Sequence, residues 1–171
     1  MENFLFDAIT RLVRAEVDFV ICGGVACVLQ GSNRNSFDLD ISVDMDENNL
    51  RKLIRVAKEM KWKPRVPEPI ENIIDPRKRE QWINEKNARV YTLNSADGVL
   101  QIDIFLNYQI GFEELKKEAD VFEIDGFRFK VSSIEHLIKA KELIEEKRRQ
   151  DSYDIDMLRE ILHGRKEKEE N

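Results

Sequence analysis

The chain has 171 residues, of which 42% are hydrophobic and 36% are charged, and its formal net charge is −6 at pH 7. This length and composition predict one soluble globular domain with a core large enough to fold alone. The negative charge argues against a protein that binds nucleic acid mainly through phosphate contacts, because such proteins usually carry the opposite sign. No apolar run approaches the roughly 18 residues of a membrane span, so no membrane partner is expected.

Smaller features of the composition indicate the cellular setting. The first ten residues, MENFLFDAIT, lack the basic start of a signal peptide, and we expect a cytoplasmic protein. Both cysteines, Cys22 and Cys27, lie in one apolar segment and are expected to be buried, reduced thiols. The abundance of Glu, Lys, Arg and Ile leans toward a thermophilic source.

The first part of the chain alternates between helical and extended patterns. Residues 3–15 place apolar side chains at helical spacing, and residues 18–24 form a short β-branched and aromatic run that ends on two glycines. A short helix is expected over 25–31 and a strand over 37–44. Residues 47–61 predict an amphipathic helix.

Two hairpins are expected in the second part of the chain. Asp97-Gly98 and Asp125-Gly126 each separate two runs typical of strands, which is a hairpin signal. The expected elements are a proline-rich loop over 62–74, a helix over 76–86, strands over 88–94 and 99–107, a short helix over 111–119, strands over 121–125 and 127–131, and helices over 134–147 and 152–162.

The mixture of hairpins and helices predicts an α/β (α+β) fold, with a mixed β-sheet flanked by helices and with helices at the C-terminus. We expect one domain over residues 1–165. Residues 166–171 are expected to be a disordered, charged tail.

The segment RNSFDLDISVDMD, residues 34–46, alternates acidic with apolar side chains. In a strand, Asp38 and Asp40 would project from one face while Leu39 and Ile41 pack on the other. Two neighbouring carboxylates suit Mg²⁺, a hard cation that prefers oxygen ligands. The same alternation also fits an ordinary strand with an acidic, solvent-exposed face.

A later strand favours the metal site. Asp103 is the only charged residue in VLQIDIFLN, residues 99–107, and a lone carboxylate in so apolar a strand is costly to bury unless it is paired or coordinated. If this strand pairs beside the first, Asp103 joins Asp38 and Asp40 in a cluster of three carboxylates. Such a cluster can hold two divalent ions during phosphoryl transfer.

A pair of glycines completes the pattern. Gly23 and Gly24 end a buried strand and lead toward a helix, and glycines at such a position allow close approach of phosphates to the backbone. Strand, Gly-Gly, helix, Asp-x-Asp and a later lone Asp resemble the DNA polymerase β-like nucleotidyltransferase superfamily. The stretch FVICGGVACVLQGSNRNSFDLDISVD is similar to small prokaryotic nucleotidyltransferase-like proteins grouped with the AbiEii toxin, with Ser36 where these typically have threonine.

The resemblance extends to the C-terminal part of the chain. Relatives of this group carry a Leu-Ile-x-x-Lys segment followed by Arg-x-x-Asp-x-x-Asp. Here Leu137 to Lys141 and Arg148 to Asp154 match these segments. Residues 62–87 match no part of the pattern.

The resemblance implies a magnesium-dependent nucleotidyltransferase. Such an enzyme transfers a nucleoside monophosphate from a nucleoside triphosphate, ATP for example, to an acceptor and releases pyrophosphate. Asp38 and Asp40 would bind one or two Mg²⁺ ions, which Mn²⁺ can replace, and Asp103 would act as a base or as a further metal ligand. The implied nucleotide-binding residues are Gly23, Gly24, Arg34, Ser36 and Lys141.

Several of these assignments have alternatives. Arg34 and Ser36 also fit an ordinary loop before a strand. Lys141, Arg148 and Arg149 either supply positive charge to the site or belong to a solvated helix face with many i,i+4 charge pairs. At the level of function, the alternative is an interaction module on the same fold, such as one member of a toxin–antitoxin pair with weak or no activity. The acceptor is open between RNA, protein and small molecules.

Overall fold

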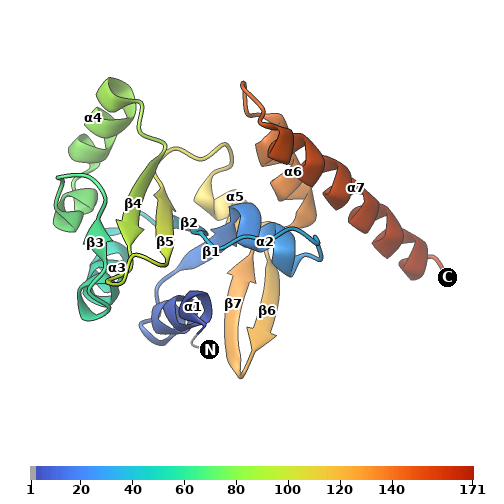
Figure 1. Ribbon diagram of the computed structural model, residues 1–171, viewed down its shortest axis with the longest axis horizontal. Coiled ribbons are helices and arrows are strands. Elements are labelled where there is room, and N and C mark those ends of the chain that lie inside the picture. The colour runs from blue at the N-terminus through green and yellow to red at the C-terminus, as the bar shows by residue number, and fades with distance from the viewer. Residues whose placement is uncertain (1–2) are drawn as a thin grey trace.

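A seven-stranded mixed sheet forms the centre of the computed structural model, which describes residues 3–171 (Figure 1). The strands lie in the order β3-β4-β5-β2-β1-β7-β6, and β1 is antiparallel to β2 but parallel to β7. The mixed sheet predicted from the sequence is therefore confirmed. The strands are β1 (Phe19–Cys22), β2 (Leu39–Val43), β3 (Lys63–Pro64), β4 (Val90–Asn94), β5 (Gln101–Phe105), β6 (Asp120–Ile124) and β7 (Phe127–Val131).

Helices surround this sheet, and the last two pack against each other beside it (Figure 1). The first helix contacts both the third helix and β7, and the fifth helix contacts β1. The helices are α1 (Phe4–Arg14), α2 (Gly23–Leu29), α3 (Glu47–Glu59), the 3₁₀ helix η1 (Ile70–Ile74), α4 (Pro76–Lys86), α5 (Phe112–Glu118), α6 (Ile134–Glu142) and α7 (Arg149–Glu169).

Strand β1 divides its side chains between two hydrophobic cores. Phe19 and Ile21 belong to the larger core, which contains most of the buried side chains of α1, α3 and the central strands. Val20 and Cys22 belong to a small core that also contains Leu115 of α5. Because successive side chains of a strand point to opposite faces, the two cores lie on opposite faces of the sheet.

The register of the sheet places the acidic residues on the face of the small core. Cys22 is paired with Asp40 across β1 and β2, and Asp40 is paired with Asp103 across β2 and β5. Thr92 of β4 is paired with Asp103 in turn. Paired residues point to the same face of a sheet, so these four side chains form one row across the sheet.

The proline-rich segment in the middle of the chain has more regular secondary structure than its sequence predicts. Residues 62–74 were expected to form a loop, but they contain β3 and η1. Ile70 and Ile73 of η1 are buried in the larger core, together with Trp62 and Trp82. Burial of these side chains explains why the segment is ordered, since apolar burial is the main favourable contribution to folding.

The C-terminal helices differ from the expected ones in length. The helix that was expected to reach residue 147 ends at Glu142. The last helix, expected over 152–162, spans Arg149–Glu169, so the prediction of a disordered tail over 166–171 is wrong for residues 166–169. Arg165 explains the extension, because its guanidinium donates hydrogen bonds to the side-chain and backbone oxygens of Gln30 after α2.

The remaining predictions on these elements hold with small shifts. Helix α2 begins at Gly23 rather than at residue 25, so both glycines lie in its first turn. Cys22 and Cys27 are buried and form no disulfide, as expected. Within residues 3–171, no helix combines the length and the apolar character needed to cross a membrane.

Candidate active site

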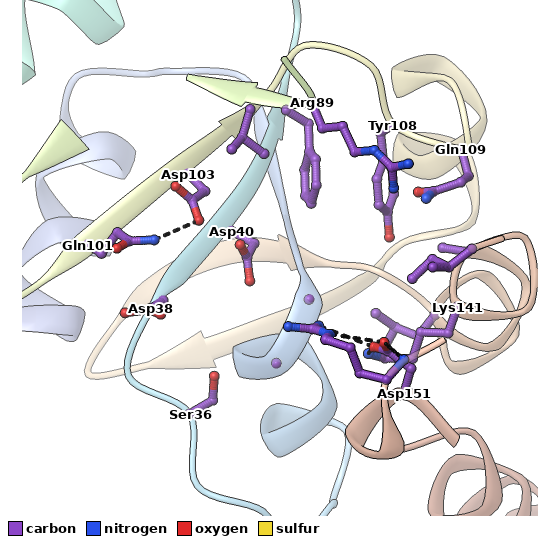
Figure 2. A pocket seen from close by; sticks show the side chains of 18 of the residues that line it. Ser36, Asp38, Asp40, Arg89, Gln101, Asp103, Tyr108, Gln109, Lys141 and Asp151 are labelled. Carbon is purple, nitrogen blue, oxygen red and sulfur yellow. Dashed lines mark hydrogen bonds and ion pairs between the residues drawn. The ribbon is translucent and has the colours of Figure 1, made fainter. Parts of the chain in front are cut away.

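One cavity of about 510 Å³ brings together residues that are far apart in the sequence. Asp40 and Asp103 line it from the neighbouring strands β2 and β5, and Asp38 lines it from the residue before β2 (Figure 2). Asp38 is exposed, whereas Asp40 and Asp103 are half-buried. The three acids that the sequence singled out therefore line a single cavity.

Asp103 is held by its neighbours on the sheet. Thr92 Oγ1 donates a hydrogen bond of 2.5 Å to Asp103 Oδ1, and Gln101 Nε2 donates one of 3.0 Å to Asp103 Oδ2 (Figure 2). Each oxygen of this carboxylate thus has a donor. Hydrogen bonds of this kind fix the orientation of the carboxylate.

Asp40 is the acid most strongly affected by its surroundings. Its pKa is raised to about 7, mainly by burial and also by the negative charges of Asp103 and Asp38. The backbone N–H of Gly24 and the ammonium of Lys141 oppose this effect. A carboxyl with such a pKa gains a proton or a cation readily near neutral pH.

These residues fit a divalent metal by the chemistry of their donors. All three supply carboxylate oxygens, which Mg²⁺ prefers, and the charges of Asp103 and Asp38 add to burial in raising the pKa of Asp40. In residues 3–171, however, no three Asp, Glu, His or Cys side chains already converge tightly enough to hold an ion. The metal assignment stays a prediction.

The two glycines make room for the side chains of the site. Gly23 has a positive φ of 63°, and a Cβ added there would lie 2.1 Å from Asp40 Oδ2. A Cβ added at Gly24 would lie 2.4 Å from Ser36 Oγ and 3.2 Å from Arg34 Cζ. Packing therefore requires glycine at both positions, because only a residue without a Cβ lets acids and polar groups lie directly against α2. The sequence alone did not indicate this structural role.

A network of charges closes the opposite side of the cavity. Lys141 of α6 is 8% exposed and pairs with Asp154 at 2.8 Å and with Asp151 at 3.3 Å. Arg34 donates to Asp154 at 2.5 Å, and Arg148 contacts Asp151 at 3.1 Å. Three cations surround two buried carboxylates, which leaves an excess of positive charge.

The C-terminal cations differ in how far they are exposed. Lys141 is buried and lines the cavity, whereas Arg148 lines the cavity with a side chain that is 79% exposed. Arg149 is exposed and does not line it. Arg34 and Ser36, which also fitted an ordinary loop, line the cavity as well.

Other residues of the cavity were missed in the sequence. Gln101 and Phe105 lie two positions from Asp103 on β5, and strand alternation in the sequence places them on the same face as Asp103 without indicating a role in the site. Arg89, Tyr108 and Gln109 lie just outside the strands, and no local pattern identifies them (Figure 2). The ring of Tyr108 packs on that of Phe105 with centroids 4.2 Å apart.

No family model matches the sequence, and no curated protein matches it. The chain is similar to solved structures. One is the lincosamide antibiotic adenylyltransferase LnuA, lincomycin-bound, with a TM-score of 0.62 and 19% identity over 94% of this chain and 98% of that chain.

Two further structures share the fold. An antigenic nucleotidyltransferase-like protein from Paracoccidioides brasiliensis has a TM-score of 0.52 and 18% identity, covering 88% of this chain and 71% of that one. The antibiotic-resistance factor ANT(2'')-Ia has a TM-score of 0.50 and 14% identity, covering 98% and 94%. These likenesses show that the chain has a nucleotidyltransferase fold. The narrower resemblance to AbiEii-related proteins stays a prediction.

Proposed function

We propose that this protein is a magnesium-dependent nucleotidyltransferase, which transfers a nucleoside monophosphate from a nucleoside triphosphate to an acceptor and releases pyrophosphate. The observation that carries the proposal is the pairing of Asp40 with Asp103 on adjacent strands, with Asp38 beside them, across one cavity from an excess of positive charge. Carboxylates for a metal and cations for phosphates are the two requirements of phosphoryl transfer.

The cations fit the triphosphate. Lys141, Arg34 and Arg148 lie along one side of the cavity, where their charges complement a polyanion. Asp151 and Asp154 neutralise them only in part and fix their positions. Gly23 and Gly24 lie between the acids and these cations, and together with Ser36 they complete the proposed nucleotide site.

Asp38, Asp40 and Asp103 would hold one or two Mg²⁺ ions, which Mn²⁺ can replace. A bound ion supplies charge neutralisation at the reacting phosphate and at the leaving oxygen. The carboxylates themselves orient the reacting groups and provide a proton acceptor. Asp103, whose position is fixed by Thr92 and Gln101, suits the role of base.

The proposed reaction is an in-line displacement at phosphorus. An acceptor hydroxyl oxygen forms a bond to the α-phosphorus as its proton passes to the Asp103 carboxylate. The bond from the α-phosphorus to the bridging oxygen breaks, and pyrophosphate leaves with the electron pair. The name of one solved neighbour, a lincosamide antibiotic adenylyltransferase, makes ATP the first nucleotide to test. The toxin–antitoxin alternative stays a prediction.

Nucleotide binding by this site can be measured without knowing the acceptor. We expect one of the four nucleoside triphosphates, with Mg²⁺, to raise the melting temperature of the protein by several degrees, because a ligand that binds only the folded state stabilises it. Asp40→Asn combined with Asp103→Asn should abolish the shift. Asp44→Asn is the matched control, because Asp44 lies after β2 and outside the cavity.

Activity is read by incubation of the protein with α-labelled triphosphates and cell extract. Label should pass to an acceptor with the wild-type protein and with Asp44→Asn, but not with the double variant. A melting temperature that responds to none of the four triphosphates would contradict the proposal.

A further inference from the structure

A polar groove of about 360 Å³ continues the cavity that the three acids line. We call it the Arg89 groove. It shares Arg89, Tyr108 and Gln109 with that cavity, so the two spaces are connected. The groove is also lined by Asn87, Asn107, Leu143 and Glu145, which come from the segments before β4, after β5 and after α6.

One ligand can contact both the groove and the acids. Arg89 and Asp103 line the same cavity. Arg89 lies three residues before the β4 residue that is paired with Asp103, which corresponds to about 10 Å along a strand at about 3.3 Å per residue. Figure 2 shows Arg89, Tyr108 and Gln109 together at the end of the cavity opposite Ser36. A molecule the size of a sugar therefore spans the distance from the groove to the Asp103 carboxylate.

Arg89 differs from the other cations of the cavity in its partners. The other three are held by the two buried carboxylates of α7. Within residues 3–171, the exposed Arg89 side chain forms no ion pair and donates no hydrogen bond, although Glu145 lines the same groove. A guanidinium binds a carboxylate or a phosphate through two parallel hydrogen bonds. Arg89 is thus available to bind an oxyanion of a ligand.

The neutral side chains of the groove suit hydroxyl groups. Asn87, Asn107 and Gln109 are exposed, and in the described part of the chain their side-chain amides form no hydrogen bond with the protein. A carboxamide offers both donors and an acceptor, as a hydroxyl does. The net charge of −6 argues against a long polyanion such as nucleic acid, so the groove favours a small ligand.

We propose that the Arg89 groove binds the acceptor, and that the acceptor is a sugar-sized polyhydroxyl compound that carries an oxyanion, either a phosphate or a carboxylate. The oxyanion contacts Arg89, further hydroxyls contact the carboxamides, and the reacting hydroxyl faces Asp103. This inference rests on the proposed function. A cationic acceptor is disfavoured, because Arg89 repels it.

Four hexoses of similar size provide the test. Glucose 6-phosphate and glucuronate carry a phosphate and a carboxylate at the same carbon, glucose is neutral, and glucosamine is cationic. Each is titrated into ¹⁵N-labelled protein that contains Mg²⁺ and α,β-methylene ATP, which occupies the cations of the triphosphate site and cannot transfer its nucleotide. Binding is read from the backbone amide signals of Asn107 and Gln109.

We expect the preferred oxyanion sugar to shift these signals with saturation and to bind at least tenfold more tightly than glucose or glucosamine. The tighter of the two oxyanion sugars tells a phosphate from a carboxylate. Arg89→Gln should remove the tenfold preference. Arg149→Gln is the matched control and should keep it, because Arg149 is exposed and lines neither space. Melting temperatures without ligand show that both variants are folded.

The outcomes separate this inference from the proposed function. No saturable shift, equal binding of the four sugars, or a full oxyanion preference in folded Arg89→Gln would overturn the groove assignment even if a triphosphate raises the melting temperature. Loss of the triphosphate-induced rise in melting temperature in Arg89→Gln would overturn it as well, by assigning Arg89 to the nucleotide. Sugar binding without any response to triphosphates would overturn the proposed function, and with it the identification of the ligand as an acceptor.

Discussion

Asp154 shows how a single side chain holds several parts of the site in place. It is fully buried and accepts hydrogen bonds or ion pairs from Arg34, Lys141 and Gln150. Arg34 lies 120 positions away in the sequence. This carboxylate therefore joins the loop before β2 to both C-terminal helices. Because all its partners are donors, the negative charge of Asp154 is stabilised by groups of the protein itself.

Removal of this charge should destabilise the fold. Asp154→Asn keeps the shape of the side chain but leaves Lys141 and Arg34 without a common counter-charge, and we expect the free energy of unfolding to fall by about 3 kcal/mol. Urea titration measures the loss. Glu47→Gln is the control, because Glu47 and Arg51 form an exposed pair for which we expect about 0.5 kcal/mol or less. Equal effects of the two substitutions would contradict the role of Asp154.

The residues of the cavity differ in how visible they are in the sequence. Asp38, Asp40 and Asp103 stand out because a charge interrupts an apolar pattern, which is a local signal. Arg89 and Gln109 carry no such signal, since they are ordinary polar residues beside strand ends. Only the register of β4 and β5 and the path of the chain after β5 bring them to the cavity.

At the scale of elements, the turn from β1 into α2 determines how closely the site is packed. Gly24→Ala would place a methyl group 2.4 Å from Ser36 Oγ. We expect a loss of nucleotide binding of at least tenfold, because the methyl group displaces Ser36 and Arg34. The loss should be read from the dependence of the melting temperature on triphosphate concentration.

Two further variants test the steric reason. Gly24→Ala combined with Ser36→Gly removes the clashing atoms and should bind nucleotide better than Gly24→Ala alone. Gly164→Ala is the control within α7, where an added Cβ meets nothing within 4 Å. It should raise the free energy of unfolding by about 0.5–1 kcal/mol, as expected for a helix interior. Full nucleotide binding by Gly24→Ala would contradict the steric argument.

Elements were predictable where periodicity and turn signals agree. The Asp-Gly turns identified the hairpins of β4 with β5 and of β6 with β7, since alternating runs flank each turn. The end of α6 was not predictable, because residues 143–147 continue a helical pattern. The Asp151 carboxylate accepts a hydrogen bond from the Arg148 backbone N–H and caps α7, so α6 ends before this cap. This competition between two helix ends depends on tertiary contacts.

At the scale of the whole molecule, α7 connects distant parts of the fold. Its first turns carry Asp151 and Asp154, which contact the cations of the cavity. Further along, Arg165 contacts Gln30 at the end of α2. Gln30 in turn donates to Asp120 of β6 at 2.7 Å. The C-terminal end of α7, just before the charged segment 166–171, is thus attached to the domain through the contact of Arg165 with Gln30.

The last prediction concerns this attachment. Arg165→Met removes two hydrogen bonds to Gln30, which is 1% exposed and cannot replace both with water, so we expect the free energy of unfolding to fall by about 2 kcal/mol. Lys166→Met is the control, because Lys166 is exposed, and its effect should stay within about 0.5 kcal/mol. Amide hydrogen exchange should also quicken from residue 164 to residue 169 in Arg165→Met alone. Equal exchange in both variants would mean that these residues gain no stability from the contact with α2.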